Sequence, residues 1–200
     1  MAVSVAAPSS PSLPPPPSSY AYTHWGSKSC GNGAELLYAG FMAGSHYTQG
    51  GNGGNYLCMH PDVQWPEKVN AGNDDQSILY TTEYEVSSNV DPSSTGHDQE
   101  AACAMCLRPN AGSTYVQWGR TACSNGHTAE YTGYVMAQTY SQKKSEFICV
   151  DAARESAVGG SSGSQDGALL YFTEFDQVLS SSTSYETNKE VACTVCSVTL

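Results

Sequence analysis

The sequence predicts an all-β protein, and three observations lead to that prediction. Runs rich in β-branched and aromatic residues recur along the chain, separated by polar segments that contain Gly, Asn, Asp and Ser. Apolar residues almost nowhere recur with the period of a helix, and only residues 151–157 are expected to form a helical turn. The eight cysteines fall into two similar groups of four. We therefore expect a β-rich, disulfide-linked fold built from two related parts.

The two related parts are visible as an internal repeat. Residues 22–49 align without a gap with residues 115–142. The identical pairs are Tyr22/Tyr115, Trp25/Trp118, Gly26/Gly119, Cys30/Cys123, Asn32/Asn125, Gly33/Gly126, Tyr38/Tyr131, Gly40/Gly133, Tyr47/Tyr140 and Gln49/Gln142. We therefore expect a first repeat subdomain over residues 22–112 and a second over residues 113–200. Residues 1–21 precede both as a Pro/Ser-rich arm or linker.

Strands are expected at corresponding places in the two repeats. In each copy an Asn-Gly pair, at 32–33 and 125–126, supplies the positive φ of a tight turn. The next strand is expected over residues 36–43 and 131–140, and the apolar residues on both faces of 36–43 predict that it is well buried. Further strands are expected over 56–59, 77–84 and 102–106 in the first repeat, and over 147–150, 168–175 and 192–196 in the second.

The arm has a composition of its own. Residues 1–21 carry no charge and hold six of the ten prolines. Such a segment favours extended polyproline II and cannot bury a core, so we expect a linker or an arm that docks on a neighbouring subunit. Its Ser and Pro residues suit O-glycosylation or proline hydroxylation. Because the first ten residues lack the features of a signal peptide, we expect the secretion signal to have been removed or to lie upstream.

Charge and cysteine content limit the function and the compartment. Eight basic and 19 acidic residues give a formal net charge of -11, and no run of Lys and Arg occurs, which argues against nucleic acid as a partner. No apolar run approaches the roughly 20 residues of a membrane helix, so no membrane span is expected. An even, duplicated set of cysteines indicates a disulfide framework in an oxidising compartment, and hence a secreted protein.

The order of the motifs resembles a known family. Trp-Gly, Cys, Leu-Tyr-x-Gly-Phe, Leu-Cys, Tyr-x-Thr-Glu and Cys-Ala-x-Cys follow one another, and the pattern returns in the second repeat. This order is similar to the C-terminal non-collagenous domain of spongin-like short-chain collagens of invertebrates, which resembles the duplicated C-terminal domain of type IV collagen. The resemblance covers about residues 22–198. It implies two β subdomains related by pseudo-twofold symmetry, exchange of hairpins between subdomains or chains, and a role in oligomer assembly.

The chain also departs from that family. It has no Gly-X-Y tract, and the Pro/Ser arm stands where collagen would be expected. Each unit has four cysteines and lacks the additional loop-closing pair of the type IV collagen unit.

The cysteine spacing by itself leaves several pairings open. The resemblance implies the bonds Cys30–Cys106, Cys58–Cys103, Cys123–Cys196 and Cys149–Cys193. Two alternatives are a zinc site that combines the two Cys-x-x-Cys pairs and a redox-active Cys-x-x-Cys. The zinc site would leave four equally duplicated cysteines unexplained, and the redox pair lacks a βαβ context.

Other residues that carry chemistry form no recognisable constellation. None of the histidines is repeated, and surface or loop positions are expected for His24, His46, His60, His97 and His127. Asp62 and the acidic segment 73–76 offer oxygen ligands for calcium, but a solvated loop is the preferred interpretation. Because no catalytic motif is present, we expect no enzyme activity, no catalytic residue, no metal and no cofactor.

The expected function is structural. Repeated aromatics such as Trp25/Trp118, Tyr38/Tyr131 and Tyr47/Tyr140 are expected at corresponding strand positions, in the core or at an interface. We expect a module of the extracellular matrix that assembles with copies of itself into an oligomer or fibre, through its β subdomains and its arm. Other matrix proteins and glycans are further expected partners. The alternative is a lectin-like carbohydrate-binding module, for which the unrepeated Trp65 is the candidate ligand contact.

Overall fold

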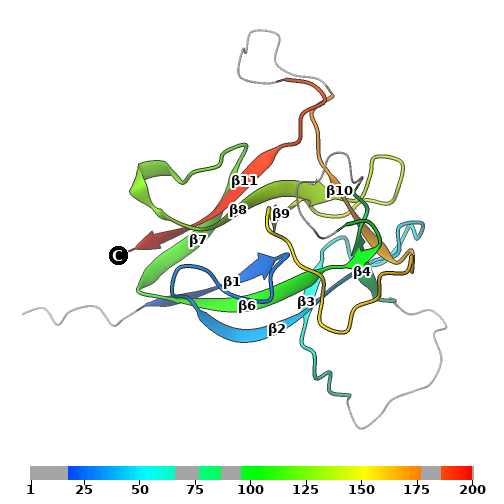
Figure 1. Ribbon diagram of the computed structural model, residues 1–200, viewed down its shortest axis with the longest axis horizontal. Coiled ribbons are helices and arrows are strands. Elements are labelled where there is room, and N and C mark those ends of the chain that lie inside the picture. The colour runs from blue at the N-terminus through cyan, green and yellow to red at the C-terminus, as the bar shows by residue number, and fades with distance from the viewer. Residues whose placement is uncertain (1–17, 66–76, 87–95, 177–185, 200) are drawn as a thin grey trace, which may run out of the picture.

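The fold, described by a computed structural model over residues 18–65, 77–86, 96–176 and 186–199, has β-strands as nearly all of its regular elements (Figure 1). This confirms the all-β class. The short turn η1 (Ser124–Gly126) is the single helical element among these residues, whereas the helical turn expected at 151–157 does not form. The arm up to residue 17 and the acidic segment 73–76 lie outside the described residues.

The first repeat contributes six strands. They are β1 (Ser19–Trp25), β2 (Glu35–Gly44), β3 (Leu57–Met59), β4 (Tyr80–Tyr84), β5 (Gln99–Glu100) and β6 (Ala102–Pro109). β6 pairs antiparallel with β1 on one side and with β2 on the other, and β2 in turn pairs with β3. β4 joins the end of β2, and the short β5 pairs with β4.

The second repeat shows the same pairing among its own strands. These are β7 (Ala111–Trp118), β8 (Thr128–Ala137), β9 (Ile148–Asp151), β10 (Ala168–Phe172) and β11 (Ala192–Thr199). β11 lies between β7 and β8, β8 pairs with β9, and β10 joins the end of β8. The duplicated sequence therefore forms duplicated strand pairing, while a pseudo-twofold axis remains a prediction.

The two repeats are joined through their strands and their cores. β10 pairs parallel with β4, and β1 meets β9 at Trp25 and Val150. One buried cluster contains Met42, Tyr56, Tyr84, Val86, Ala101, Cys103, Met136, Ile148, Val150, Ala168 and Leu170. The other contains Tyr22, Ala104, Cys106, Tyr131, Val135, Cys149, Cys193 and Val195. Each cluster draws residues from both repeats, so within the described ranges the repeats share their hydrophobic cores.

The four disulfides have the pairing that the resemblance implies. In each repeat, one bond starts in the turn before the long strand (β2 or β8) and the other starts in the short strand (β3 or β9). Both bonds end on the last strand of the repeat (β6 or β11). The bonds are Cys30–Cys106, Cys58–Cys103, Cys123–Cys196 and Cys149–Cys193, and no cysteine is free. This pairing leaves no cysteine free to bind zinc, and no bond joins the two cysteines of one Cys-x-x-Cys. Four disulfides indicate a secreted or extracellular protein.

Both Asn-Gly pairs adopt the predicted backbone. Asn32 and Gly33 have φ of 49° and 77°, and Asn125 and Gly126 have φ of 56° and 72°. Asparagine and glycine tolerate this left-handed region better than other residues, so the same turn precedes β2 and β8.

Two expectations about the strands were wrong in detail. β2 was expected to be well buried, but Leu36 and Leu37 at its start are 46% and 48% exposed, and only Met42–Gly44 are buried. The arm was expected to reach residue 21, but β1 already begins at Ser19. β1 and β7 were not predicted as strands, although both carry the repeated Tyr-x-x-Trp sequence.

Candidate functional site

A groove lined by aromatic side chains lies between β1 and β7. Its volume is about 360 Å³. Tyr22, Thr23 and Trp25 line it from β1, and Thr114, Tyr115, Val116 and Trp118 line it from β7; Tyr131, Glu146, Phe147, Ile148, Cys149 and Val195 complete it. Two of the repeated pairs, Tyr22/Tyr115 and Trp25/Trp118, therefore meet in one place.

The groove owes its position to the strand order. β7 is the last strand of the sheet path, so one of its edges has no strand partner among the described residues. β1 is paired along its length only with β6, and it touches β9 at Trp25 alone. Aromatic side chains thus lie between two strand edges, and such edges can pair with a further extended segment.

Burial divides the lining into a fixed floor and an open rim. Tyr22 and Tyr131 are both 7% exposed, whereas Trp118 is 50% and Phe147 is 61% exposed. The Tyr22 hydroxyl donates to Glu130 Oε2 at 3.0 Å, and the Tyr131 hydroxyl donates to the Cys149 carbonyl at 2.9 Å. Burial is the main cause that raises the pKa of both tyrosines, so both phenols stay protonated at neutral pH.

A polar network lies beneath the groove, where the two repeats meet. Glu130 is buried and accepts hydrogen bonds from Tyr22 and from Ser197 Oγ at 2.6 Å, with Arg108 Nε at 3.3 Å. Arg108 and Tyr22 come from the first repeat, whereas Glu130 and Ser197 come from the second. The carboxylate thus bridges the repeats through charge-assisted hydrogen bonds.

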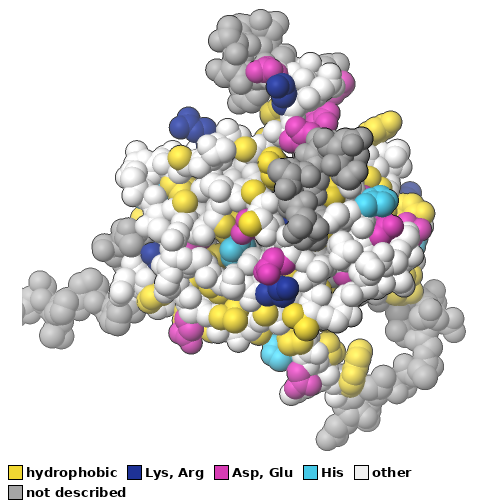
Figure 2. Space-filling view, in the orientation of Figure 1, with side chains coloured by type: hydrophobic (Ala, Val, Ile, Leu, Met, Phe, Trp, Pro, Cys, Tyr) yellow, Lys and Arg dark blue, Asp and Glu magenta, His cyan; other side chains and the backbone are white. Residues whose placement is uncertain are grey.

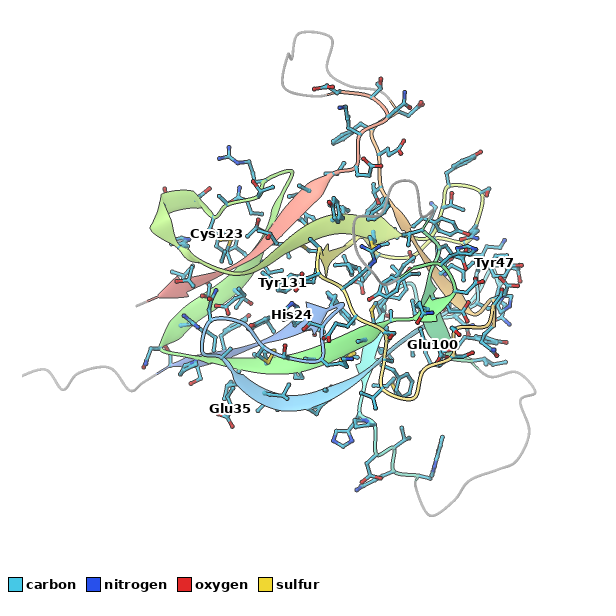
Figure 3. The ribbon with its side chains drawn as sticks, viewed as in Figure 1. His24, Glu35, Tyr47, Glu100, Cys123 and Tyr131 are labelled. Carbon is cyan, nitrogen blue, oxygen red and sulfur yellow. A yellow bond between two sulfur atoms is a disulfide. The ribbon has the colours of Figure 1, made fainter. Side chains whose placement is uncertain are left out.

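His24 is the second part of this network. It is only 4% exposed and stacks on Tyr131, with ring centroids 4.0 Å apart (Figure 3). Its Nε2 lies 2.6 Å from Asp151 Oδ2. The expectation that every histidine lies at the surface or in a loop was therefore wrong for His24, because β1 carries it into the junction of the repeats. The hydroxyl of Ser27, three residues after His24 in the chain, contacts Ser29 and Glu155 and not the imidazole of His24.

One further cluster has the donor types of a metal site. Glu85, His97 and Asp98 bring their side-chain donor atoms within 4.8 Å of one another. His97 Nδ1 lies 3.2 Å from Glu85 Oε2, and its Nε2 lies 3.5 Å from Asp98 Oδ1. Both ring nitrogens thus already face carboxylates, and the cluster runs from the exposed His97 to the largely buried Glu85.

The structure separates the other residues singled out from the sequence. Trp65 is 76% exposed and is not among the residues that line the groove. Tyr47 and Tyr140 lie in turns after the ends of β2 and β8, so the prediction of strand positions was wrong for both. Tyr140 is 99% exposed and is not a core residue. Leu36 and Leu37 form a separate exposed apolar pair.

The surface carries no concentration of positive charge on the face shown in Figure 2. Lys and Arg appear there as single groups among uncharged and acidic side chains. Among the described residues, no helix has the length and apolar character needed to cross a membrane. Comparison with protein-family models, curated proteins and solved structures found no match.

Proposed function

We propose that this chain is a structural module of the extracellular matrix that associates with copies of itself. The observation that carries the proposal is the aromatic groove between β1 and β7. It combines exposed Trp118 and Phe147 with two strand edges, and aromatic residues are enriched where protein surfaces meet. The proposal assigns the chain no catalytic activity and no cofactor.

Other features of the surface support self-association. Leu36 and Leu37 at the start of β2 leave an exposed apolar pair on the first repeat. The cross-linked core gives a rigid base for an interface, since every cysteine is held in a disulfide. A formal net charge of -11 keeps free copies apart at low salt and makes their contact dependent on ionic strength.

The family resemblance agrees with this function. A relationship to the non-collagenous domain of spongin-like collagens implies hairpin exchange and oligomer assembly, and we propose the same role here. The duplicated strand pairing and the four disulfides support the relationship.

Sedimentation velocity across a range of protein concentrations tests self-association directly. We expect the mean mass to rise with concentration, and to do so more steeply at 0.5 M than at 0.05 M salt because screening removes the repulsion. Trp118→Asp should suppress the rise, whereas Tyr140→Asp, with the same charge change outside the groove, should not. A chain that stays monomeric under all these conditions contradicts the proposal. Negative-stain images then distinguish closed particles from fibres.

A lectin-like function is the second candidate. Exposed aromatic faces stack on sugar rings, and Trp118, Phe147 and Trp65 all present such faces. Asp62, Val63 and Gln64 line a shallow pocket directly before Trp65 in the chain. Glycan-array binding that is lost in Trp65→Ala or in Trp118→Ala would favour this function and would identify which of the two surfaces binds the sugar.

A further inference from the structure

We propose that the aromatic groove binds the proline-rich segment 8–17 of a second copy of this chain. The inference rests on the proposed self-association and names the two surfaces that meet. The segment reads PSSPSLPPPP, and the groove is the one defined above between β1 and β7.

The chemistry of the two surfaces matches. Proline-rich segments in the polyproline II conformation dock into grooves lined by aromatic rings, where the rings pack against the proline faces. Tyr22, Trp25, Tyr115, Trp118 and Phe147 supply such rings. Polyproline II leaves its carbonyl groups free to accept hydrogen bonds. Within the part of the chain that the structure describes, the indole N–H groups of both tryptophans have no acceptor and are available as donors.

The lengths of the segment and the groove also match. Polyproline II rises about 3.1 Å per residue, so the four consecutive prolines 14–17 span roughly 12 Å. On β1 the groove extends from Tyr22 to Trp25, a distance of about 10 Å at the rise of a β-strand. Four prolines therefore cover the aromatic rings along one wall of the groove.

The position of the arm favours a second copy over the same copy. Ser18 Oγ donates to the Ala111 carbonyl at 3.0 Å, so the residue that leads into β1 lies beside the start of β7. The groove begins farther along both strands, at Tyr22 and Thr114. To enter its own groove, the chain would have to reverse immediately before Ser18, where four prolines stiffen it. The groove of a neighbouring copy needs no such reversal.

Charge favours the same partner. Residues 1–21 carry no charge, so the whole formal charge of -11 belongs to the remainder of the chain. The arm can therefore approach another copy without adding repulsion. Glu146 is the single charged residue in the lining of the groove, and its Oε1 already accepts a hydrogen bond from the Tyr56 amide at 2.8 Å. An uncharged segment therefore meets little electrostatic opposition there.

A synthetic peptide of residues 8–18 tests the proposal on the full chain. We expect the peptide to change the tryptophan fluorescence and to lower the mean mass in sedimentation, because it competes with the arms of other copies. Trp118→Ala and Phe147→Ala should each weaken peptide binding about tenfold or more, as removal of a central aromatic contact does. A peptide in which prolines 14–17 are replaced by glycine should not compete. Replacing the same prolines by glycine in the full chain should weaken self-association to a similar extent.

Matched controls separate the possible outcomes. Tyr140→Ala removes a more exposed aromatic outside the groove and should leave peptide affinity within about twofold of the original. If the peptide does not bind while the chain still self-associates, the arm is not the contact and self-association stands. If the chain neither binds the peptide nor self-associates, both proposals fail. If Phe147→Ala and a folded Trp118→Ala both keep the original peptide affinity, the groove is excluded as the peptide-binding site. If the groove binds a sugar and not the peptide, the groove is a lectin site.

Discussion

Replacing Gly133 with alanine tests how closely the strands of each repeat approach one another. Gly133 lies in the middle of β8 and pairs with Asp151 of β9. A Cβ atom at this position would lie 1.7 Å from the Val150 carbonyl oxygen and 2.6 Å from its carbon. The equivalent Gly40 of β2 has the same relation to the Met59 carbonyl, at 1.9 Å. The repeat therefore keeps glycine here because backbone atoms of the neighbouring strand occupy the place of a side chain.

The cost follows from the movement that the alanine requires. A Cβ contact shorter than 3.0 Å is essentially not observed, so β9 would have to move by at least 3.0 − 1.7 = 1.3 Å. That movement takes hydrogen bonds of about 2.9 Å beyond their useful range. Losing two or three of them costs roughly 0.5–1.5 kcal/mol each, and disturbing the packing of fully buried Val150 adds about 1–3 kcal/mol. We expect Gly133→Ala to lower the free energy of unfolding by about 3–5 kcal/mol.

Gly40→Ala should cost less, at about 2–3 kcal/mol. Each short strand is held by a disulfide to the last strand of its repeat, so the difference lies elsewhere. β3 is paired only with β2 and is partly exposed, so it can give way, whereas β9 is largely buried and also meets β1. Urea unfolding with the disulfides intact, followed by tryptophan fluorescence, measures both. Gly51→Ala is the control, since nothing lies within 4 Å of its Cβ position. A Gly133→Ala variant within 0.5 kcal/mol of the original, or one less destabilised than Gly40→Ala, would refute the reasoning.

Three further predictions concern the disulfides, the acidic cluster and the junction of the repeats. Replacing Cys149 and Cys193 together by alanine should lower the unfolding free energy by about 4 kcal/mol, because their bond closes a separation of 44 residues, and a loss below 1 kcal/mol in urea unfolding would contradict this. Burial and acidic neighbours raise the pKa of Glu85, so the stability that Glu85 contributes is present below its ordinary pKa and is lost as the pH rises through the raised pKa. Glu85→Gln should therefore gain stability over the original chain between pH 4 and pH 7. A difference in stability that does not change with pH would argue against this prediction. His24→Ala leaves the Asp151 carboxylate without its imidazole partner and should cost about 2–4 kcal/mol in thermal or urea unfolding, whereas an exposed histidine variant should cost under 0.5 kcal/mol.

The sequence was informative where local patterns determine structure. β6 and β11 were expected at their cysteine motifs, and the Asn-Gly turns before β2 and β8 have the predicted positive φ. Alternation and turn residues are properties of neighbouring positions, so they can be read without knowing the fold. The disulfide pairing came from the family resemblance, because the cysteine spacing alone left other pairings open.

The groove could not be predicted, because it depends on which strands remain at an edge. β1 and β7 contain the repeated Tyr-x-x-Trp sequence, but their neighbours are fixed only by the pairing of β6 and β11. His24 is an example of the same limit, since its partner Asp151 is 127 residues away. Gly40 and Gly133 fall within the strands expected over 36–43 and 131–140, and the close approach that explains why they are glycines appears only when β3 and β9 are in place.

The shared cores explain why the functional surface lies between the repeats. A single repeat would expose its half of both hydrophobic clusters. One repeat alone would therefore bury too little surface to fold, and the two repeats of the chain must pack together. Their meeting buries Tyr22 and Tyr131 but leaves β1 and β7 as neighbouring edges, with Trp118 exposed beside them. The aromatic groove is thus a product of the duplication itself, since each wall repeats the sequence of the other and neither repeat contains a groove of this kind alone. Any partner of the groove consequently requires the intact pair of repeats, and loosening their junction at His24 or Glu130 should weaken binding without any change in the groove residues.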